Sequence, residues 1–127
     1  MKTYARNAYP GEVDLWAGKS LLLEELSFEL TERCNNNCVH CFINRPAHDP
    51  QARAGELTTS GITGILDEAA SLGCLKVRFT GGEPLLRGDF SQIYIHARKR
   101  GMVAEILTNA TLITEAAADL FQKIPPR

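Results

Sequence analysis

Three of the four cysteines, Cys34, Cys38 and Cys41, fall within eight residues of one another. Thiolates separated by three and then by two residues can converge on one metal centre. Three cysteines are one short of the usual four-cysteine set of an iron–sulfur cluster. A [4Fe–4S] cluster held by three cysteines would leave one iron without a protein ligand, and that iron could bind a substrate or cofactor directly. The spacing favours such a cluster.

Other interpretations of these cysteines stay open. A zinc site of three cysteines and one histidine could recruit His40 or His48. His40 is poorly placed because it directly precedes Cys41, whereas His48 lies in a loop between two prolines. Free buried thiols are a weaker alternative, because three cysteines so close together in a loop are not a packing pattern. A disulfide is disfavoured because the N-terminus lacks the apolar stretch of a signal peptide, which makes a reducing cytoplasm the expected location.

The second chemical feature is the segment Gly81-Gly82-Glu83-Pro84. Two glycines let the backbone adopt positive φ angles and approach a ligand closely. Pro84 biases Glu83 towards an extended conformation. A carboxylate is thereby held beside exposed backbone amides, where it could accept hydrogen bonds from a ligand ammonium group. Gly-Gly and Pro also mark ordinary turns, so the segment alone does not separate a binding site from a turn.

Hydrophobic periodicity indicates the elements that carry both features. Strands are predicted over residues 26–31, 75–79 and 103–108. Helices are predicted from about 58 to 73, from 89 to 101 with Asp89 and Gln92 as a capping box, and from Thr114 to about Lys123. The apolar residues expected to face the core are Leu75, Val77 and Phe79 in the second strand, Ile62, Ile65, Leu66 and Ala69 in the first helix, and Phe90, Ile93, Tyr94 and Ala97 in the second helix. Residues 32–57 are predicted to be a long irregular loop. This order of strands and helices predicts an α/β fold with a parallel sheet, and both chemical features follow the C-terminal ends of strands, where sites lie in such folds.

Polar residues occupy one face of the predicted sheet. Ser27 and Glu29 alternate with apolar residues in the first strand, and Lys76 and Arg78 do so in the second. We interpret this face as a barrel lumen, with the apolar face packed on helices; an open sheet with one solvated face is the simpler alternative. We expect Lys76 and Arg78 to pair with Glu29 and Glu105, because charges inside a fold are rarely left unpaired; the alternative is that the two residues bind substrate.

Together, the CxxxCxxC spacing and the GGEP segment resemble the radical S-adenosylmethionine (SAM) superfamily. The resemblance covers roughly residues 26–123. The amino-acid sequence around the two motifs is most similar to that of the peptide- and protein-modifying branch, whose enzymes have a C-terminal auxiliary-cluster domain. The resemblance implies a [4Fe–4S] cluster on Cys34, Cys38 and Cys41, and an enzyme that cleaves SAM reductively to methionine and a 5′-deoxyadenosyl radical, which takes a hydrogen atom from a substrate. The cofactor would carry the chemistry and the protein would orient it.

The resemblance also implies roles for residues around the cluster. Glu83 and the backbone of Gly81 and Gly82 would hold the SAM ammonium group. His40 stands where the family usually has an aromatic residue near the adenine. Further contacts with SAM are implied for the end of the third strand, at Thr108 and Asn109. Implied partners are a small electron donor protein of the flavodoxin or ferredoxin type and a peptide or protein substrate.

Three βα units cannot close an eight-unit barrel, which needs roughly 250 residues. We therefore expect residues 25–127 to be a truncated radical SAM core domain, the N-terminal half of a partial (β/α) TIM-like barrel, and residues 1–24 to be an N-terminal extension that we do not assign. An inactive truncation and a non-catalytic zinc-binding module on Cys34, Cys38 and Cys41 are the alternatives to a working enzyme core.

Composition excludes several classes of protein. The chain has 127 residues, of which 44% are hydrophobic and 23% charged, as in globular domains rather than disordered ones. Its net charge of −1 lacks the basic excess of a general nucleic-acid or anionic-membrane binder. Apolar runs are too short for a membrane-spanning helix. Cys74, the fourth cysteine, is expected to be a small buried hydrophobic residue.

Overall fold

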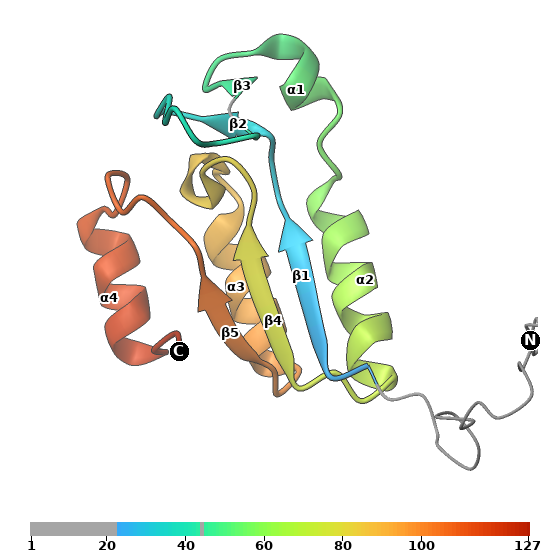
Figure 1. The fold of residues 1–127 in the computed structure, drawn as a ribbon. Helices are drawn as coiled ribbons and strands as arrows, with labels where there is room; N and C mark the ends of the chain where they lie inside the picture. The colour runs from blue at the N-terminus through green and yellow to red at the C-terminus, as the bar shows by residue number, and fades with distance from the viewer. Residues whose placement is uncertain (1–22, 44) are drawn as a thin grey trace, which may run out of the picture.

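The computed structural model describes residues 23–43 and 45–127. Its centre is a parallel three-stranded sheet in the order β1-β4-β5 (Figure 1). The strands are β1 (Glu25–Glu29), β4 (Lys76–Thr80) and β5 (Val103–Ile106), and the principal helices are α2 (Thr59–Ser71), α3 (Phe90–Lys99) and α4 (Glu115–Lys123). The predicted α/β fold of three parallel βα units is therefore confirmed.

The region predicted to be a long irregular loop contains short elements, so that prediction was wrong in part. Strands β2 (Arg33–Cys34) and β3 (Arg45–Pro46) pair in parallel, and helix α1 (Pro50–Ala54) follows them. Asp49 caps α1 by accepting hydrogen bonds from the amides of Gln51 and Ala52. A short 3-10 helix, η1 (Pro84–Leu86), follows β4. A strand of two residues shows no alternation, and a helix of three to five residues is about one turn, so the sequence pattern does not indicate either.

The core lies between the sheet and helices α2 and α3. Val77 and Phe79 of β4 are fully buried, as are Ile62 and Leu66 of α2. The predicted apolar stripe of α3 is confirmed in full, since Phe90, Ile93, Tyr94 and Ala97 are all buried. Cys74 is buried as expected. This packing fixes the direction of the strands and therefore the place where their C-terminal ends meet.

The helices begin and end largely at the residues that the sequence indicates. The hydroxyl groups of Thr58 and Thr114 accept hydrogen bonds from amides in the first turns of α2 and α4. Gly73 and Gly101, which follow α2 and α3, have φ angles of 87° and 83°, a backbone region that favours glycine. The capping box predicted at Asp89 is not formed, because its carboxylate binds Arg87 and Thr59 instead of the amides of α3.

Two residues predicted to face the core do not. Leu75, assigned to the second strand, lies one residue before β4 and is 70% exposed. Ile65, assigned to the stripe of the first long helix, is 39% exposed because only part of α2 is covered. Both belong to surfaces at the ends or edges of the three-stranded sheet.

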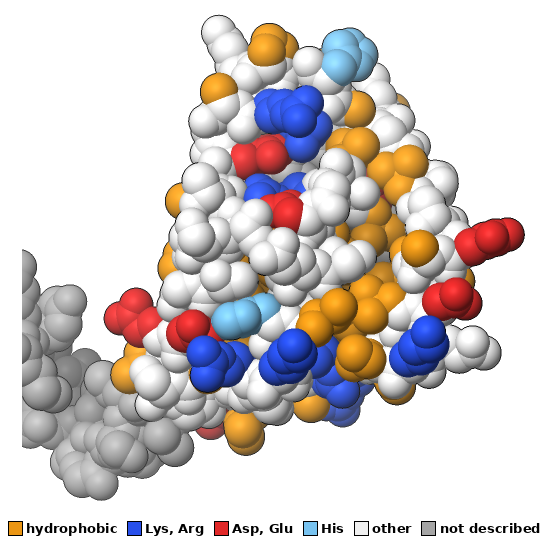
Figure 2. All heavy atoms as spheres, turned by 180° about the vertical axis from the view of Figure 1, so that it is seen from behind, with side chains coloured by type: hydrophobic (Ala, Val, Ile, Leu, Met, Phe, Trp, Pro, Cys, Tyr) orange, Lys and Arg blue, Asp and Glu red, His pale blue; other side chains and the backbone are white. Residues whose placement is uncertain are grey.

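Figure 2 shows acidic and basic side chains next to one another over the helical side of the molecule.

The polar face of the sheet carries the ion pairs expected of it, with one different partner. Arg78 binds Glu105 at 2.6 Å and Glu25 at 3.2 Å, and Lys76 binds the same two carboxylates at 3.4 and 3.2 Å. The prediction of Glu105 is thus confirmed, whereas that of Glu29 is wrong. The register explains the difference: Glu25 is the direct cross-strand neighbour of Lys76, while Glu29 lies opposite Thr80 at the other end of β1.

The expected N-terminal extension lies almost wholly outside the described residues. Within the part of the chain that the structure describes, none of the helices combines the length and the apolar character needed to cross a membrane.

Candidate functional site

The two chemical features meet at the C-terminal ends of the strands. The cysteine loop between β2 and β3 lies above the end of β1, close to the turn after β4 (Figure 1). The loop is closed at its base by the β2–β3 pair, in which Arg33 lies opposite Arg45 and Cys34 opposite Pro46. The amide of Arg45 also donates to the carbonyl of Glu32 at 3.0 Å. We call these paired residues, together with Thr31 just before them, the neck of the loop (residues 31–34 and 45–46).

The turn after β4 is bonded directly to this neck. The amide of Gly82 donates to the carbonyl of Thr31 at 2.7 Å, and the amide of Glu83 donates to the carbonyl of Arg33 at 2.8 Å. A Cβ on Gly82 would lie 2.2 Å from the Arg33 oxygen, and one on Gly81 would lie 2.3 Å from the Thr31 oxygen. The approach of the two backbones therefore requires glycine at both positions, and Gly81 also has a φ of 133°.

Glu83 joins this turn to the end of β5. Its side chain is fully buried and accepts three hydrogen bonds, from the hydroxyl of Thr108 at 2.8 Å, the amide of Asn109 at 2.8 Å and the amide of Leu85 at 2.9 Å. A carboxylate has about four acceptor positions, so most are filled by the protein. The sequence-predicted residues Glu83, Thr108 and Asn109 are thus brought together around one buried carboxylate.

The predicted cysteine ligands have the right chemistry but are not gathered. All three are free thiols; Cys34 is half-buried, and Cys38 and Cys41 are exposed. Among the described residues no group of three or more His, Cys, Asp or Glu side chains is already arranged to hold a metal ion. The amide of Cys41 donates to the carbonyl of Cys38 at 3.0 Å, which folds this part of the loop into a turn. The three expected cluster ligands thus lie on one segment, with Cys34 in β2 and Cys38 and Cys41 in the loop that follows it.

Asn109 connects the cysteine loop to β5. Its side-chain nitrogen donates to the side-chain oxygen of Asn35 at 2.9 Å and lies 3.9 Å from the sulfur of Cys34. The amide of Asn36 donates to the same sulfur at 3.4 Å. Hydrogen bonds to cysteine sulfurs tune the reduction potential of a cluster bound to them. Cys34 is thus the cysteine whose position the fold determines most completely.

The two histidines of this region differ in their surroundings. His40, expected near an adenine, is exposed on the loop between Cys38 and Cys41. His48, the expected zinc ligand of the alternative interpretation, lines the same hollow as Cys34, but Cys38 and Cys41 do not line it. The zinc set of three cysteines and His48 is therefore not assembled among the described residues.

A network of buried charges beneath the neck was missed by the sequence analysis. Arg33 is 7% exposed and Arg87 8% exposed, and they are neutralised by Glu56 and Asp89. Burial acts to raise the pKa of Glu56, but hydrogen bonds donated by Arg33 and Thr31 keep that pKa below its usual value. The hydrogen bond from Arg87 lowers the pKa of Asp89. No local pattern identifies this network, because its partners are up to 31 residues apart in the chain.

Comparison with known proteins decides the family. The model of the Radical SAM superfamily matches residues 28–127. This chain belongs to the radical SAM superfamily. Of its relatives, the Fe-coproporphyrin III synthase of Methanosarcina barkeri is 37% identical over 97 residues, which are 76% of this chain and 24% of that protein. The PqqA peptide cyclase of Gluconobacter oxydans is 37% identical over 87 residues, which are 68% of this chain and 24% of that protein.

Solved structures of radical SAM proteins share the fold. SuiB of Streptococcus suis bound to S-adenosylmethionine superimposes with a TM-score of 0.69 at 26% identity, over 80% of this chain and 23% of that one. A structure of SuiB bound to its precursor peptide SuiA gives a TM-score of 0.68. This radical SAM chain spans about a quarter of the length of these relatives. The resemblance inferred from the cysteine spacing and the GGEP segment is confirmed, and the homologous proteins named above are enzymes.

Proposed function

We propose that this chain is the part of a radical SAM enzyme that binds a [4Fe–4S] cluster and the amino-acid end of SAM. The observation that carries the proposal is the pair of hydrogen bonds between the Gly-Gly-Glu turn and the neck of the cysteine loop, from Gly82 to Thr31 and from Glu83 to Arg33. These bonds hold the glycine backbone next to the start of the cysteine loop. A molecule bound to the iron that has no protein ligand, in a cluster held in part by Cys34, would therefore lie near the backbone of this turn.

The residues present fit the cluster by their chemistry. Cys34, Cys38 and Cys41 would ligate three irons, and their free thiols lie in one loop with amide donors around Cys34. When bound, the cluster would supply the electron for reductive cleavage of SAM to methionine and a 5′-deoxyadenosyl radical, which abstracts a hydrogen atom from the substrate. The role of this chain is to hold the cofactors in the orientation that this chemistry needs.

Each remaining site residue has a proposed role that follows from its position. We assign the SAM ammonium group to the backbone of Gly81 and Gly82, because the carboxylate of Glu83 is buried and bonded to the protein. Glu83 would contribute by holding Thr108 and Asn109 at the edge of the same pocket. His40, exposed on the loop, would offer a flat ring face to the adenine.

The relatives support a proposal for the substrate class. PqqA peptide cyclase is named for a peptide, and SuiB has been crystallised with a precursor peptide, so we propose a peptide or protein substrate for the complete enzyme. A flavodoxin- or ferredoxin-type protein would deliver the electron. Free cysteines are stable in a reducing environment, which supports a cytoplasmic location.

The test is anaerobic reconstitution of the full-length gene product with iron and sulfide, followed by metal analysis and EPR of the reduced protein with and without SAM. We expect four irons per chain at this site and a signal that changes when SAM is added. Cys34→Ala should abolish both, whereas Cys74→Ala, which changes a buried cysteine away from the loop, should retain both. One zinc and no iron would contradict the proposal in favour of the zinc-binding module, and a cluster whose signal does not change with SAM would contradict the proposed binding of SAM.

A further inference from the structure

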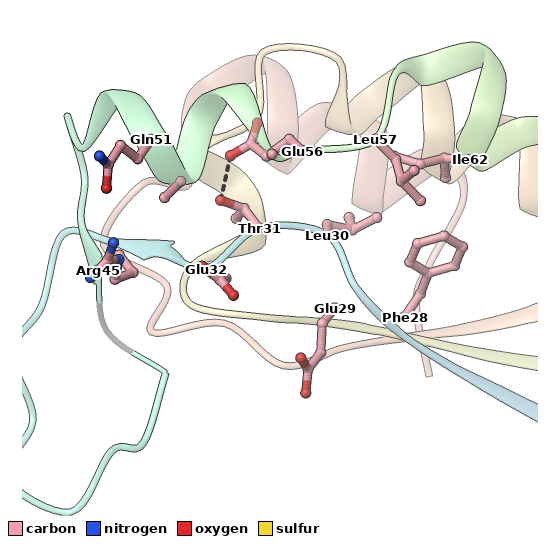
Figure 3. A pocket seen from close by; sticks show the side chains of 12 residues that line it. Phe28, Glu29, Leu30, Thr31, Glu32, Arg45, Gln51, Glu56, Leu57 and Ile62 are labelled. Atoms are coloured by element: carbon pink, nitrogen blue, oxygen red, sulfur yellow. Dashed lines mark hydrogen bonds between the residues drawn. The ribbon is translucent and has the colours of Figure 1, made fainter.

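Glu56 lies at the centre of the contacts that hold the neck of the cysteine loop. It belongs to the connection between α1 and α2, yet its carboxylate accepts hydrogen bonds from Arg33 Nε at 2.6 Å and Nη2 at 3.3 Å. The hydroxyl of Thr31 donates to the same carboxylate at 2.5 Å, as Figure 3 shows. Arg87 Nη1 lies 3.5 Å from its other oxygen. One side chain thus contacts the residues that lead into the loop and a residue that follows the Gly-Gly-Glu turn.

Arg33 transmits this contact to both sides of the neck. Its guanidinium group donates to the carbonyl of Ala47, just after β3, at 2.8 Å. Its own carbonyl accepts the amide of Glu83 at 2.8 Å. The residue that immediately precedes Cys34 is therefore bonded to the far side of the loop by its side chain and to the Gly-Gly-Glu turn by its backbone. A rotation of Arg33 would displace Cys34 and the turn together.

Arg87 ties the same carboxylate to the sheet. It donates to the carbonyl of Leu30 at the end of β1 at 3.2 Å and to the carbonyl of Leu57 at 3.0 Å. Two bonds to Asp89, at 2.9 and 2.7 Å, fix its plane. Two arginines and two carboxylates balance in charge. Removal of one carboxylate would leave a buried arginine without its partner, which is the costly way to break such a network.

We propose that Glu56 is a positioning residue for the SAM site: through Arg33 and Arg87 it sets the orientation of Cys34 relative to the Gly-Gly-Glu turn. The inference rests on the proposed function for its consequence, since this orientation is what would place SAM between its iron and the glycine backbone. Misplacement of reacting groups by about 1 Å can cost about a hundredfold in rate, so a residue remote from the chemistry can control it. Glu56 itself contacts neither of the proposed cofactor sites.

The structural part of the inference is tested without any cofactor, by amide hydrogen exchange of the full-length apoprotein. Three amides donate to carbonyls of the neck, those of Arg45, Gly82 and Glu83, and we refer to them as the neck amides. In Glu56→Gln we expect them to exchange at least about tenfold faster than in wild type. The amide of Leu107, which bonds β5 to β4, reports opening of the sheet and should change far less.

Asp67→Asn is the matched control, because Asp67 also accepts bonds from two basic side chains, those of His96 and Arg100, but joins α2 to α3. It should leave the neck amides unchanged. Should Glu56→Gln fail to fold, Arg33→Lys serves in its place, since lysine keeps the charge and loses the forked contact with Glu56 and Ala47. Equal exchange at the neck in the test and control variants would overturn the inference.

The functional part is tested by titrating SAM into the reconstituted, reduced proteins and following the EPR signal. Glu56→Gln should bind as much iron as wild type and Asp67→Asn, because its cysteines are intact, but need at least about tenfold more SAM for half of the spectral change. A loosened neck with an unchanged SAM titration would show that Glu56 stabilises the loop without positioning SAM, and would also overturn the inference. Absence of iron in the wild type would contradict the proposed function alone, because the exchange experiment still decides the role of Glu56 at the neck.

Discussion

The amide of Asn109 lies 2.8 Å from Oε2 of Glu83, so a buried carboxylate joins the turn after β4 to the end of β5. The same carboxylate accepts the hydroxyl of Thr108 and the amide of Leu85 through its other oxygen. Two of the proposed SAM-site residues thus depend on a third for their position. The Gly-Gly-Glu segment therefore bonds to two parts of the fold. The backbone of Gly82 bonds to the neck of the cysteine loop, and the side chain of Glu83 bonds to the end of β5.

Glu83→Gln should destabilise the protein by about 1–3 kcal/mol. A glutamine can offer one acceptor oxygen, so its NH2 group must face either the amide of Asn109 or the donors Leu85 and Thr108. Urea unfolding followed by circular dichroism measures the loss. Glu29→Gln is the control, because Glu29 has no hydrogen bond or ion pair to any described residue and points away from Leu30 in Figure 3; its unfolding free energy should stay within about 0.5 kcal/mol of wild type. A wild-type unfolding free energy in Glu83→Gln would contradict the structural role given to Glu83.

The elements that position the site could be predicted from the sequence because they depend on repeated local signals. Alternating residues marked β1 and β4, and the stripe from Phe90 to Ala97 marked α3. The strand ends were misplaced by one or two residues, since the last residues of a strand differ little from the loop that follows. The GGEP segment was located for the same local reason, but the inward direction of Glu83 depends on donors more than 20 residues away.

Gly81→Ala and Gly82→Ala should each destabilise the protein by at least about 2 kcal/mol. The added Cβ would meet a backbone oxygen of Thr31 or Arg33, which cannot move aside as the end of a flexible side chain can. Gly64→Ala is a matched control: nothing lies within 4 Å of its Cβ position in α2, and alanine there should stabilise the protein by about 0.5–1 kcal/mol. Urea midpoints of the three variants decide the matter, and tolerance of alanine at position 82 would argue against the close approach of the two backbones.

The pairing of the charged side chains could not be predicted from the sequence. Alternation placed Lys76 and Arg78 on the polar face, but the choice between Glu25 and Glu29 as their partner depends on strand register, which only the pairing of β1 with β4 determines. Arg33 and Glu56 look like ordinary loop charges until the fold brings them together and buries them. The cysteines are the opposite case, since their types and spacing indicate a ligand set that the protein chain alone does not gather.

Acid should destabilise the wild type partly through Asp89. The hydrogen bond from Arg87 lowers the pKa of this carboxyl group in the folded protein. Asp89 therefore binds a proton more readily in the unfolded protein than in the folded one. The stabilisation is therefore present above the ordinary aspartate pKa of about 3.9 and is lost as pH falls through the lower folded value. Asp89→Asn should show a shallower decline of the urea midpoint between pH 5 and 2.5. Asp119→Asn, on the exposed side of α4, should follow the wild-type curve; parallel curves for all three proteins would contradict the assignment.

The last prediction concerns Tyr94, whose hydroxyl donates to the carbonyl of Ile124 at 2.7 Å and so fastens the end of α4 to α3. Tyr94→Phe keeps the ring contacts with Phe90 and Phe121 but leaves this carbonyl without its donor, which should cost about 1–2 kcal/mol of unfolding free energy at pH 7. Burial raises the pKa of the hydroxyl above its ordinary value of about 10. The folded state therefore keeps its proton longer than the unfolded state, and stability that is complete below about pH 10 is lost as pH rises towards the folded pKa. Urea midpoints from pH 7 to 11.5 should fall more steeply in wild type than in Tyr94→Phe, and equal slopes would show that the hydroxyl is not held in a buried bond.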